Sequence, residues 1–149
     1  MQKYERLMLY LKEAFLHIER LNNILAYLKK FYPITNEKID VIDANYLDAF
    51  AYRFAKLQDL LGAKIFRVYL EVNNFPVQDK NFLTLLKELQ KEGIVDIDKW
   101  AEFRGVRNTF AHDYPYEESQ KIEAINYLIQ NINYLFEVAK KIKDQCEIK

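Results

Sequence analysis

Residues 47–72 read LDAFAYRFAKLQDLLGAKIFRVYLEV, and their apolar side chains recur every three or four positions. That spacing predicts an amphipathic helix, capped by Asp43 or Asn45 and ending before Pro76. About thirty helical residues would span about 45 Å. Further apolar residues in its second half widen the apolar surface beyond one stripe: Leu60, Phe66, Tyr69 and Leu70. We therefore expect a helix that lies at the centre of the fold or meets a second subunit.

The segments on both sides of this helix have the same period. Further helices are predicted from Tyr4 to about Phe31, from Asp79 to Gly93, from Asp96 or Asp98 to near Pro115, and from near Glu117 through Ile142. Three glycines and three prolines are too few for the frequent turns of an all-β fold. We predict an all-α, up-and-down bundle of about five helices, with residues 1–149 forming one domain.

Composition and charge limit the classes of function. The 149 residues carry 22 basic and 22 acidic side chains, so the net charge is zero and any anion-binding site must be local. Charged residues near Met1 and the lack of a long apolar run predict neither a signal peptide nor a membrane span. The single cysteine, Cys146, excludes an intrachain disulfide and multi-cysteine zinc sites. We expect a soluble, cytoplasmic protein.

The chain offers few metal ligands, because it has only two histidines, His17 and His112. His17 lies between Leu16 and Ile18 and is expected to be a packed or surface histidine. No His-Glu-x-x-His pattern, glycine-rich phosphate loop or nucleophile elbow is present. The sequence therefore predicts no bound metal and no cofactor.

The segment 104–115, RGVRNTFAHDYP, gathers groups suited to phosphate chemistry. Arginine makes forked contacts with phosphate, and histidine exchanges protons near neutral pH. Together Arg107 and His112 could cleave RNA without metal, by assisting attack of a ribose 2′-hydroxyl on its own phosphate. Arg104 is expected either to widen the phosphate site or to stay solvated.

Helix geometry limits how these side chains could meet. In an unbroken helix Arg107 and His112 would lie about 140° apart, whereas Asn108 and His112 would share one face. Bringing Arg107 to the same phosphate requires the helix to unwind before His112, or a second subunit to contribute its own copy. Gly105 would allow another helix to approach closely there.

The segment resembles the signature of the HEPN domains, and within them of the HepT-like toxins: Arg, four residues, His, one residue, Tyr. Arg107, His112 and Tyr114 match it, with Asn108 in the usual place after the arginine. The resemblance also covers residues 98–104 and, more loosely, residues 52–70. It implies a homodimeric, metal-independent ribonuclease whose two signatures share one cleft. It also implies a cognate minimal nucleotidyltransferase that acts as antitoxin by adding AMP to Tyr114.

In this interpretation Arg107 holds the scissile phosphate of an RNA substrate and His112 is the general base or acid. Asn108 orients them, and Tyr114 is the control point. Structural alternatives are an ion pair between Arg107 and Glu102 or Asp113, a helix-capping His112, and an ordinary aromatic residue at position 114. The rival functions are a non-catalytic subunit that presents substrate to the nucleotidyltransferase, and an interaction bundle with a chance motif.

Overall fold

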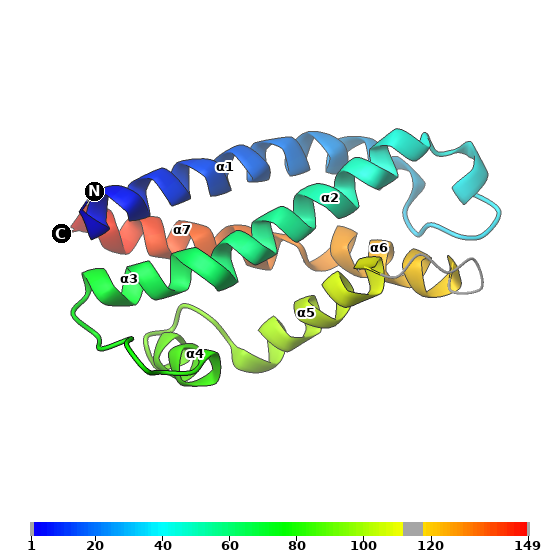
Figure 1. Cartoon of the computed structure of the whole chain (residues 1–149). Helices are drawn as coiled ribbons and strands as arrows, with labels where there is room; N and C mark the ends of the chain where they lie inside the picture. Colours follow the sequence, from blue (N-terminus) through cyan, green and yellow to red (C-terminus); the bar gives the residue numbers. More distant parts are fainter. Residues whose placement is uncertain (1, 112–117, 149) are drawn as a thin grey trace.

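The computed structural model describes residues 2–111 and 118–148, and every regular element in them is helical (Figure 1). The α-helices are α1 (Lys3–Leu28), α2 (Ala44–Leu60), α3 (Phe66–Val72), α4 (Phe82–Lys91), α5 (Ile97–Ala111), α6 (Glu118–Asn131) and α7 (Asn133–Ile148). A π-helical turn, η3 (Leu61–Ile65), joins α2 to α3, and two 3-10 turns flank the first loop, η1 (Lys29–Phe31) and η2 (Ile39–Val41). The prediction of an all-α bundle is confirmed for the described residues.

The long helices alternate in direction along the bundle (Figure 1). α1 runs away from the end where both termini lie, the α2–η3–α3 helix returns to it, α5 runs outward, and α6 and α7 return. The short α4 lies between the end of α3 and the start of α5. This is the up-and-down order that the sequence predicted.

The central helix extends from Ala44 through η3 to Val72, within the predicted bounds. Asp43 caps it, because its Oδ1 accepts a hydrogen bond from the Asn45 backbone N–H at 2.9 Å. The additional apolar residues of its second half are all buried within the chain: Leu60, Phe66, Tyr69 and Leu70. Of the two expected positions, the helix therefore takes the central one, and its apolar surface gives no argument for a second subunit.

The last predicted helix is two helices, α6 and α7, which meet at Ile132 (Figure 1). The side-chain Nδ2 of Asn131 donates to the Tyr127 carbonyl at 2.9 Å. In a regular helix that carbonyl would accept from the backbone N–H of residue 131, so the asparagine side chain competes with the helical ladder. The described residues thus form six α-helices when α2, η3 and α3 are counted as one, against about five expected.

The structure moves the start of α4 from the predicted Asp79 to Phe82. Asp79 has a φ of +65°, outside helical conformation. Asn81 caps the helix instead, since its Oδ1 accepts from the Thr84 backbone N–H at 2.9 Å. At the other end Gly93 has a φ of +76°, which is the left-handed helix stop expected there.

α5 is held in place at its first turn and along its inner face. Asp96 Oδ1 accepts from the Lys99 N–H at 2.9 Å and caps the helix, while the Asp96 N–H donates to the Tyr134 hydroxyl at 2.7 Å. Farther along, the buried Phe103 packs against Phe54 of α2, with ring centroids 6.3 Å apart. These contacts fix the position of α5 relative to α2. They therefore also fix the position of Arg104 and Arg107, which α5 carries.

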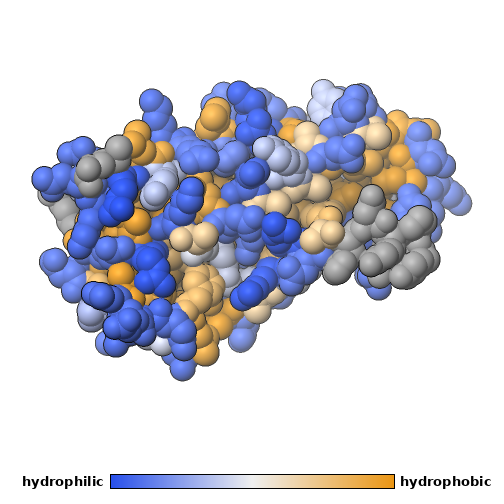
Figure 2. Space-filling view, viewed as in Figure 1, coloured by the Kyte–Doolittle hydropathy of each residue, from blue (hydrophilic) through white to orange (hydrophobic). Residues whose placement is uncertain are grey.

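Hydrophilic residues cover most of the face seen in Figure 2, with hydrophobic residues scattered between them. The largest exposed apolar side chains include Leu9, Leu16, Tyr52 and Leu83. No helix in the described ranges is long and apolar enough to cross a membrane.

Candidate functional site

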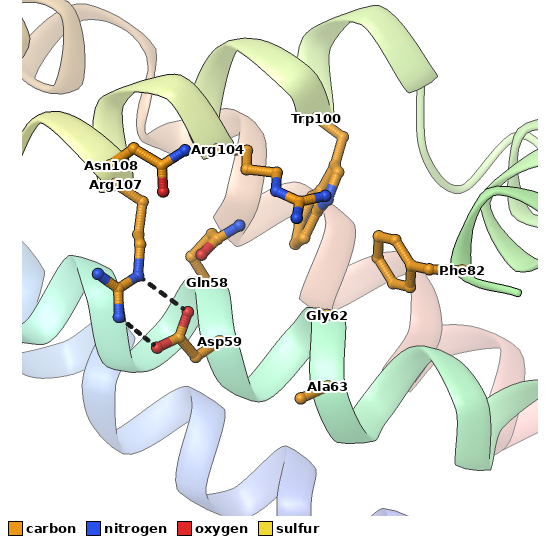
Figure 3. A pocket seen from close by; sticks show the side chains of 9 residues that line it. All are labelled: Gln58, Asp59, Gly62, Ala63, Phe82, Trp100, Arg104, Arg107 and Asn108. Atoms are coloured by element: carbon orange, nitrogen blue, oxygen red, sulfur yellow. Dashed lines mark hydrogen bonds and ion pairs between the residues drawn. The ribbon is translucent and has the colours of Figure 1, made fainter. Parts of the chain in front are cut away.

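An open groove of about 540 Å³ lies between α2 and α5 (Figure 3). Side chains from α2, η3, α4 and α5 line it: Gln58, Asp59, Gly62, Ala63, Phe82, Trp100, Arg104, Arg107 and Asn108. Three of these, Arg104, Arg107 and Asn108, belong to the segment that the sequence singled out. Their spacing of three and four residues places them on one face of α5.

Arg107 forms a two-point ion pair with Asp59 of α2 (Figure 3). Its Nε donates to Oδ1 at 3.3 Å and its Nη2 donates to Oδ2 at 3.1 Å. The hydrogen bonds that Arg107 donates to Asp59 raise the pKa of Arg107, so the guanidinium stays charged throughout the physiological range. Of the two partners expected for Arg107, Glu102 instead accepts from the Tyr127 hydroxyl at 3.1 Å, and Asp113 lies outside the described residues.

The Asp59 contact leaves part of Arg107 available. A guanidinium has five N–H groups, and the two bonds to Asp59 leave three of them without a partner among the described residues. A bidentate carboxylate also fixes the plane of the guanidinium. Arg107 is therefore an oriented cation that can still donate to an anion entering the groove.

Arg104 and Asn108 are exposed, and their side chains make no hydrogen bond or ion pair with a described residue. Figure 3 shows Arg104 extending along the groove toward Trp100, while the Asn108 amide points toward Gln58. The groove thus holds two guanidinium groups against the single Asp59 carboxylate. It is a locally cationic site on a chain whose net charge is zero.

Aromatic side chains form the opposite end of the groove. Trp100 is buried and its ring lies 4.9 Å from Phe66 and 6.3 Å from Phe82, measured between centroids. Gly62 of η3 permits this close packing, because a Cβ there would lie 3.0 Å from Trp100 Cζ2. π-Helical turns are frequent at functional sites, and this one borders the groove directly.

Gln58 is a buried polar side chain at the base of the groove, with 6% of its surface exposed. Its amide makes no hydrogen bond with a described residue. In Figure 3 the amide extends from α2 toward α5, between Asn108 and Arg104. Because Gln58 lines the groove, its amide meets solvent there and can exchange hydrogen bonds with a group that enters the groove.

His17 lies elsewhere, buried between α1 and α2 as expected. Arg53 Nη1 lies 3.1 Å from His17 Nδ1, and because arginine only donates, Nδ1 accepts and the ring proton sits on Nε2. Burial, followed by the charge of Arg53, lowers the pKa of His17. This histidine is a packed, neutral side chain that does not border the groove.

The predicted roles of His112 and Tyr114 concern residues outside the described part of the chain. α5 is helical through Ala111, directly before His112. Within residues 2–111 and 118–148, no three His, Cys, Asp or Glu side chains gather in a way that could hold a metal ion.

The sequence prediction missed Gln58, Asp59, Gly62, Phe82 and Trp100. One signal was available, because Gln58 stands in the apolar stripe of residues 47–72, four positions after Phe54 and three before Leu61. A polar residue at an inward-facing position marks a site worth examining. The pairing of Asp59 with Arg107 had no such signal, since 48 residues separate them.

Comparison with known proteins returned no matching family model, no matching curated protein and no matching solved structure. The functional conclusion therefore depends on the groove and on the segment 104–114.

Proposed function

We propose that this chain is a metal-independent endoribonuclease of the HEPN type, the toxin of a two-gene module whose other product is a minimal nucleotidyltransferase. One observation supports the proposal most directly. Arg104, Arg107 and Asn108 share the wall of one cationic groove, and the sequence places His112 and Tyr114 immediately beyond the described end of the same helix.

The chemistry needs a cation at the scissile phosphate and a group that moves protons. Arg107, oriented by Asp59, holds the phosphate through its remaining N–H groups. His112 takes the proton from the ribose 2′-hydroxyl as its oxygen attacks phosphorus. The bond from phosphorus to the 5′-oxygen breaks, that oxygen gains a proton, and the products are a 2′,3′-cyclic phosphate and a 5′-hydroxyl.

A homodimer would complete the site. Arg107 and a helical residue 112 would point about 140° apart, so one chain alone does not direct both at one phosphate without unwinding. Two copies facing each other across a two-fold axis would supply two arginines and two histidines. Gly105 offers room for such an approach, because no atom lies within 4 Å of a Cβ built there.

Tyr114 would be the regulatory residue. A phenol is a poor base at neutral pH, but its oxygen accepts a nucleotidyl group. The partner enzyme would transfer AMP from ATP to this oxygen, with loss of the tyrosine proton and release of pyrophosphate. The added phosphate would compete with RNA for Arg107 by charge and by volume.

The test is RNA cleavage by the purified chain in the presence of a chelator. Wild-type protein is expected to cleave, whereas Arg107→Ala and His112→Ala should lose at least a hundredfold in rate, in line with removal of an electrostatic or proton-transfer group. Arg20→Ala is the matched control, because Arg20 is exposed on α1 and does not border the groove. It should cleave at the wild-type rate.

Full activity in Arg107→Ala or in His112→Ala, or activity lost on adding chelator, would contradict the proposal. Absence of any cleavage, together with binding of the chain to its nucleotidyltransferase, would favour the non-catalytic subunit. Incubation with that enzyme and ATP should add one adenylyl mass to wild type and none to Tyr114→Phe, as measured on the intact protein.

A further inference from the structure

The groove contains more than a phosphate site requires. Arg107 lies at one end, the ring of Phe82 and the edge of Trp100 form the other end, and the amide of Gln58 lies between them (Figure 3). We propose that this second end is a subsite for one nucleotide of single-stranded RNA, adjoining the phosphate held by Arg107. The inference rests on the proposed function, because it takes RNA as the substrate, and it names the residues that contact the neighbouring base.

Gln58 is the most enclosed polar side chain of the groove. It is 94% buried, its amide has no hydrogen-bond partner among the described residues, and it is aimed into the groove from α2. A carboxamide offers one acceptor and two donor hydrogens, which match the donor and acceptor pairs on a base edge. Asn108 presents a second unpaired amide from α5, on the opposite wall.

The aromatic end suits a flat, apolar ring. Phe82 is half-buried and reaches the groove from α4, and Trp100 packs against both Phe66 and Phe82. Gly62 leaves space beside the indole, since a side chain at this position would contact Trp100. Bases of single-stranded RNA are bound by aromatic packing combined with hydrogen bonds to their edges, which is the combination present here.

Charge and size fit one nucleotide. Arg104 stands one turn before Arg107 on α5 and has no ion-pair partner among the described residues, so it can hold a neighbouring phosphate. The groove volume of about 540 Å³ falls within the range of small-molecule sites, about 300–1,000 Å³. A simple anion would contact the arginines but would make no contact with the amides and the aromatic rings of the groove.

Trp100 reports on this groove directly, because it is the only tryptophan in the chain. AMP added at up to millimolar concentration should change indole fluorescence in a saturable manner. Ribose 5-phosphate carries the same sugar and phosphate without a base, and it should bind at least about tenfold more weakly. Equal affinity for the two compounds would show that the groove binds only the phosphate, and it would overturn the inference.

Three variants assign the contacts. Gln58→Leu keeps the shape of the side chain and removes its hydrogen bonds, and should weaken AMP binding about tenfold. Phe82→Ala should have an effect of the same size, whereas Arg104→Gln should weaken AMP and ribose 5-phosphate alike. Lys87→Gln is the matched control for lost charge, because Lys87 is exposed on α4 and does not border the groove. Thermal unfolding of each variant establishes that it folds.

Cleavage kinetics separate this inference from the proposed function. In the nuclease assay Gln58→Leu should raise KM about tenfold with kcat changed less than twofold, since the residue contacts the base and not the reacting atoms. If wild type cleaves RNA, while AMP gives no fluorescence change and Gln58→Leu has the wild-type KM, the subsite is wrong and the nuclease stands. If AMP binds with the expected dependence on Gln58 and Phe82 and no RNA is cleaved, the nucleotide site stands and the nuclease is wrong.

Discussion

Asp59 determines how Arg107 can act in the groove. The two N–H···O contacts of 3.1 and 3.3 Å hold the guanidinium plane toward α2. Both side chains are substantially exposed, at 34% for Arg107 and 50% for Asp59, so the pair contributes less than about 1 kcal/mol to stability. Its main consequence is the orientation of Arg107, which makes Asp59 a positioning residue.

Replacing Asp59 by Asn tests this role. The amide keeps the shape and one acceptor but removes the charge and the two-point contact, so Arg107 gains rotational freedom. We expect kcat for RNA cleavage to fall about tenfold with little change in KM, since orientation matters most in the transition state. Thermal unfolding should shift by only a few degrees. An increase in kcat would show instead that Asp59 competes with the substrate phosphate for Arg107.

At the scale of the elements, η3 and α5 each contain a glycine, and the two glycines have opposite surroundings. Gly62 packs against the buried Trp100, whereas Gly105 has open space where a side chain would stand. Both lie in helical segments, and alanine is favoured over glycine in a helix by about 1 kcal/mol. Alanine substitutions at the two positions therefore distinguish the effect of helix propensity on stability from the effect of packing.

Gly105→Ala should raise the free energy of unfolding of the single chain by about 1 kcal/mol, because only propensity changes. Gly62→Ala should lower it by about 1 kcal/mol, since crowding of the rigid indole at 3.0 Å outweighs the same gain. Denaturant unfolding of both variants, followed by helical signal, measures the difference. Equal stabilisation would mean that Trp100 yields to the new methyl group and that Gly62 does not fix the packing.

At the scale of the whole molecule, the proposed function requires a chain of zero net charge to bind RNA through a local group of cations. Arg104 and Arg107 are the cations that line the groove. Pairing two chains would double the number of these cations. Gly105 of α5 is exposed, and no atom lies within 4 Å of a Cβ built there. The proposed two-fold assembly would use this space for the approach of a helix from the second chain.

Sedimentation velocity at micromolar concentration should therefore show a species of two 17.9 kDa chains. Gly105→Ala should shift it toward the single chain, because the added methyl group hinders close approach of helices. Leu83→Ala serves as the control, because Leu83 is an exposed residue of another helix, α4. This variant should leave the dimer intact. A monomer with full nuclease activity would remove the composite cleft.

The sequence by itself determined the helices and most of their ends. The apolar period along residues 47–72 gave the central helix, Asp43 and Gly93 have the capping and stop roles expected of them, and residues 104–108 were correctly placed on one helix. These features depend on side chains within a few positions of one another, so local propensity and hydrogen bonding are sufficient to specify them. The break at Ile132 escaped detection because the competing bond of Asn131 leaves the apolar period intact.

The tertiary structure decided what those helices place together. Asp59 meets Arg107 across 48 positions, Gln58 lies opposite Asn108, and Phe82 and Trp100 close the same groove from different helices. It also placed the broad apolar surface of α3 inside the chain instead of on an outer face. Periodicity shows which side of each helix is apolar, but packing alone sets which polar residues on neighbouring helices come into contact, because that depends on the rotation and crossing of the helices in the bundle.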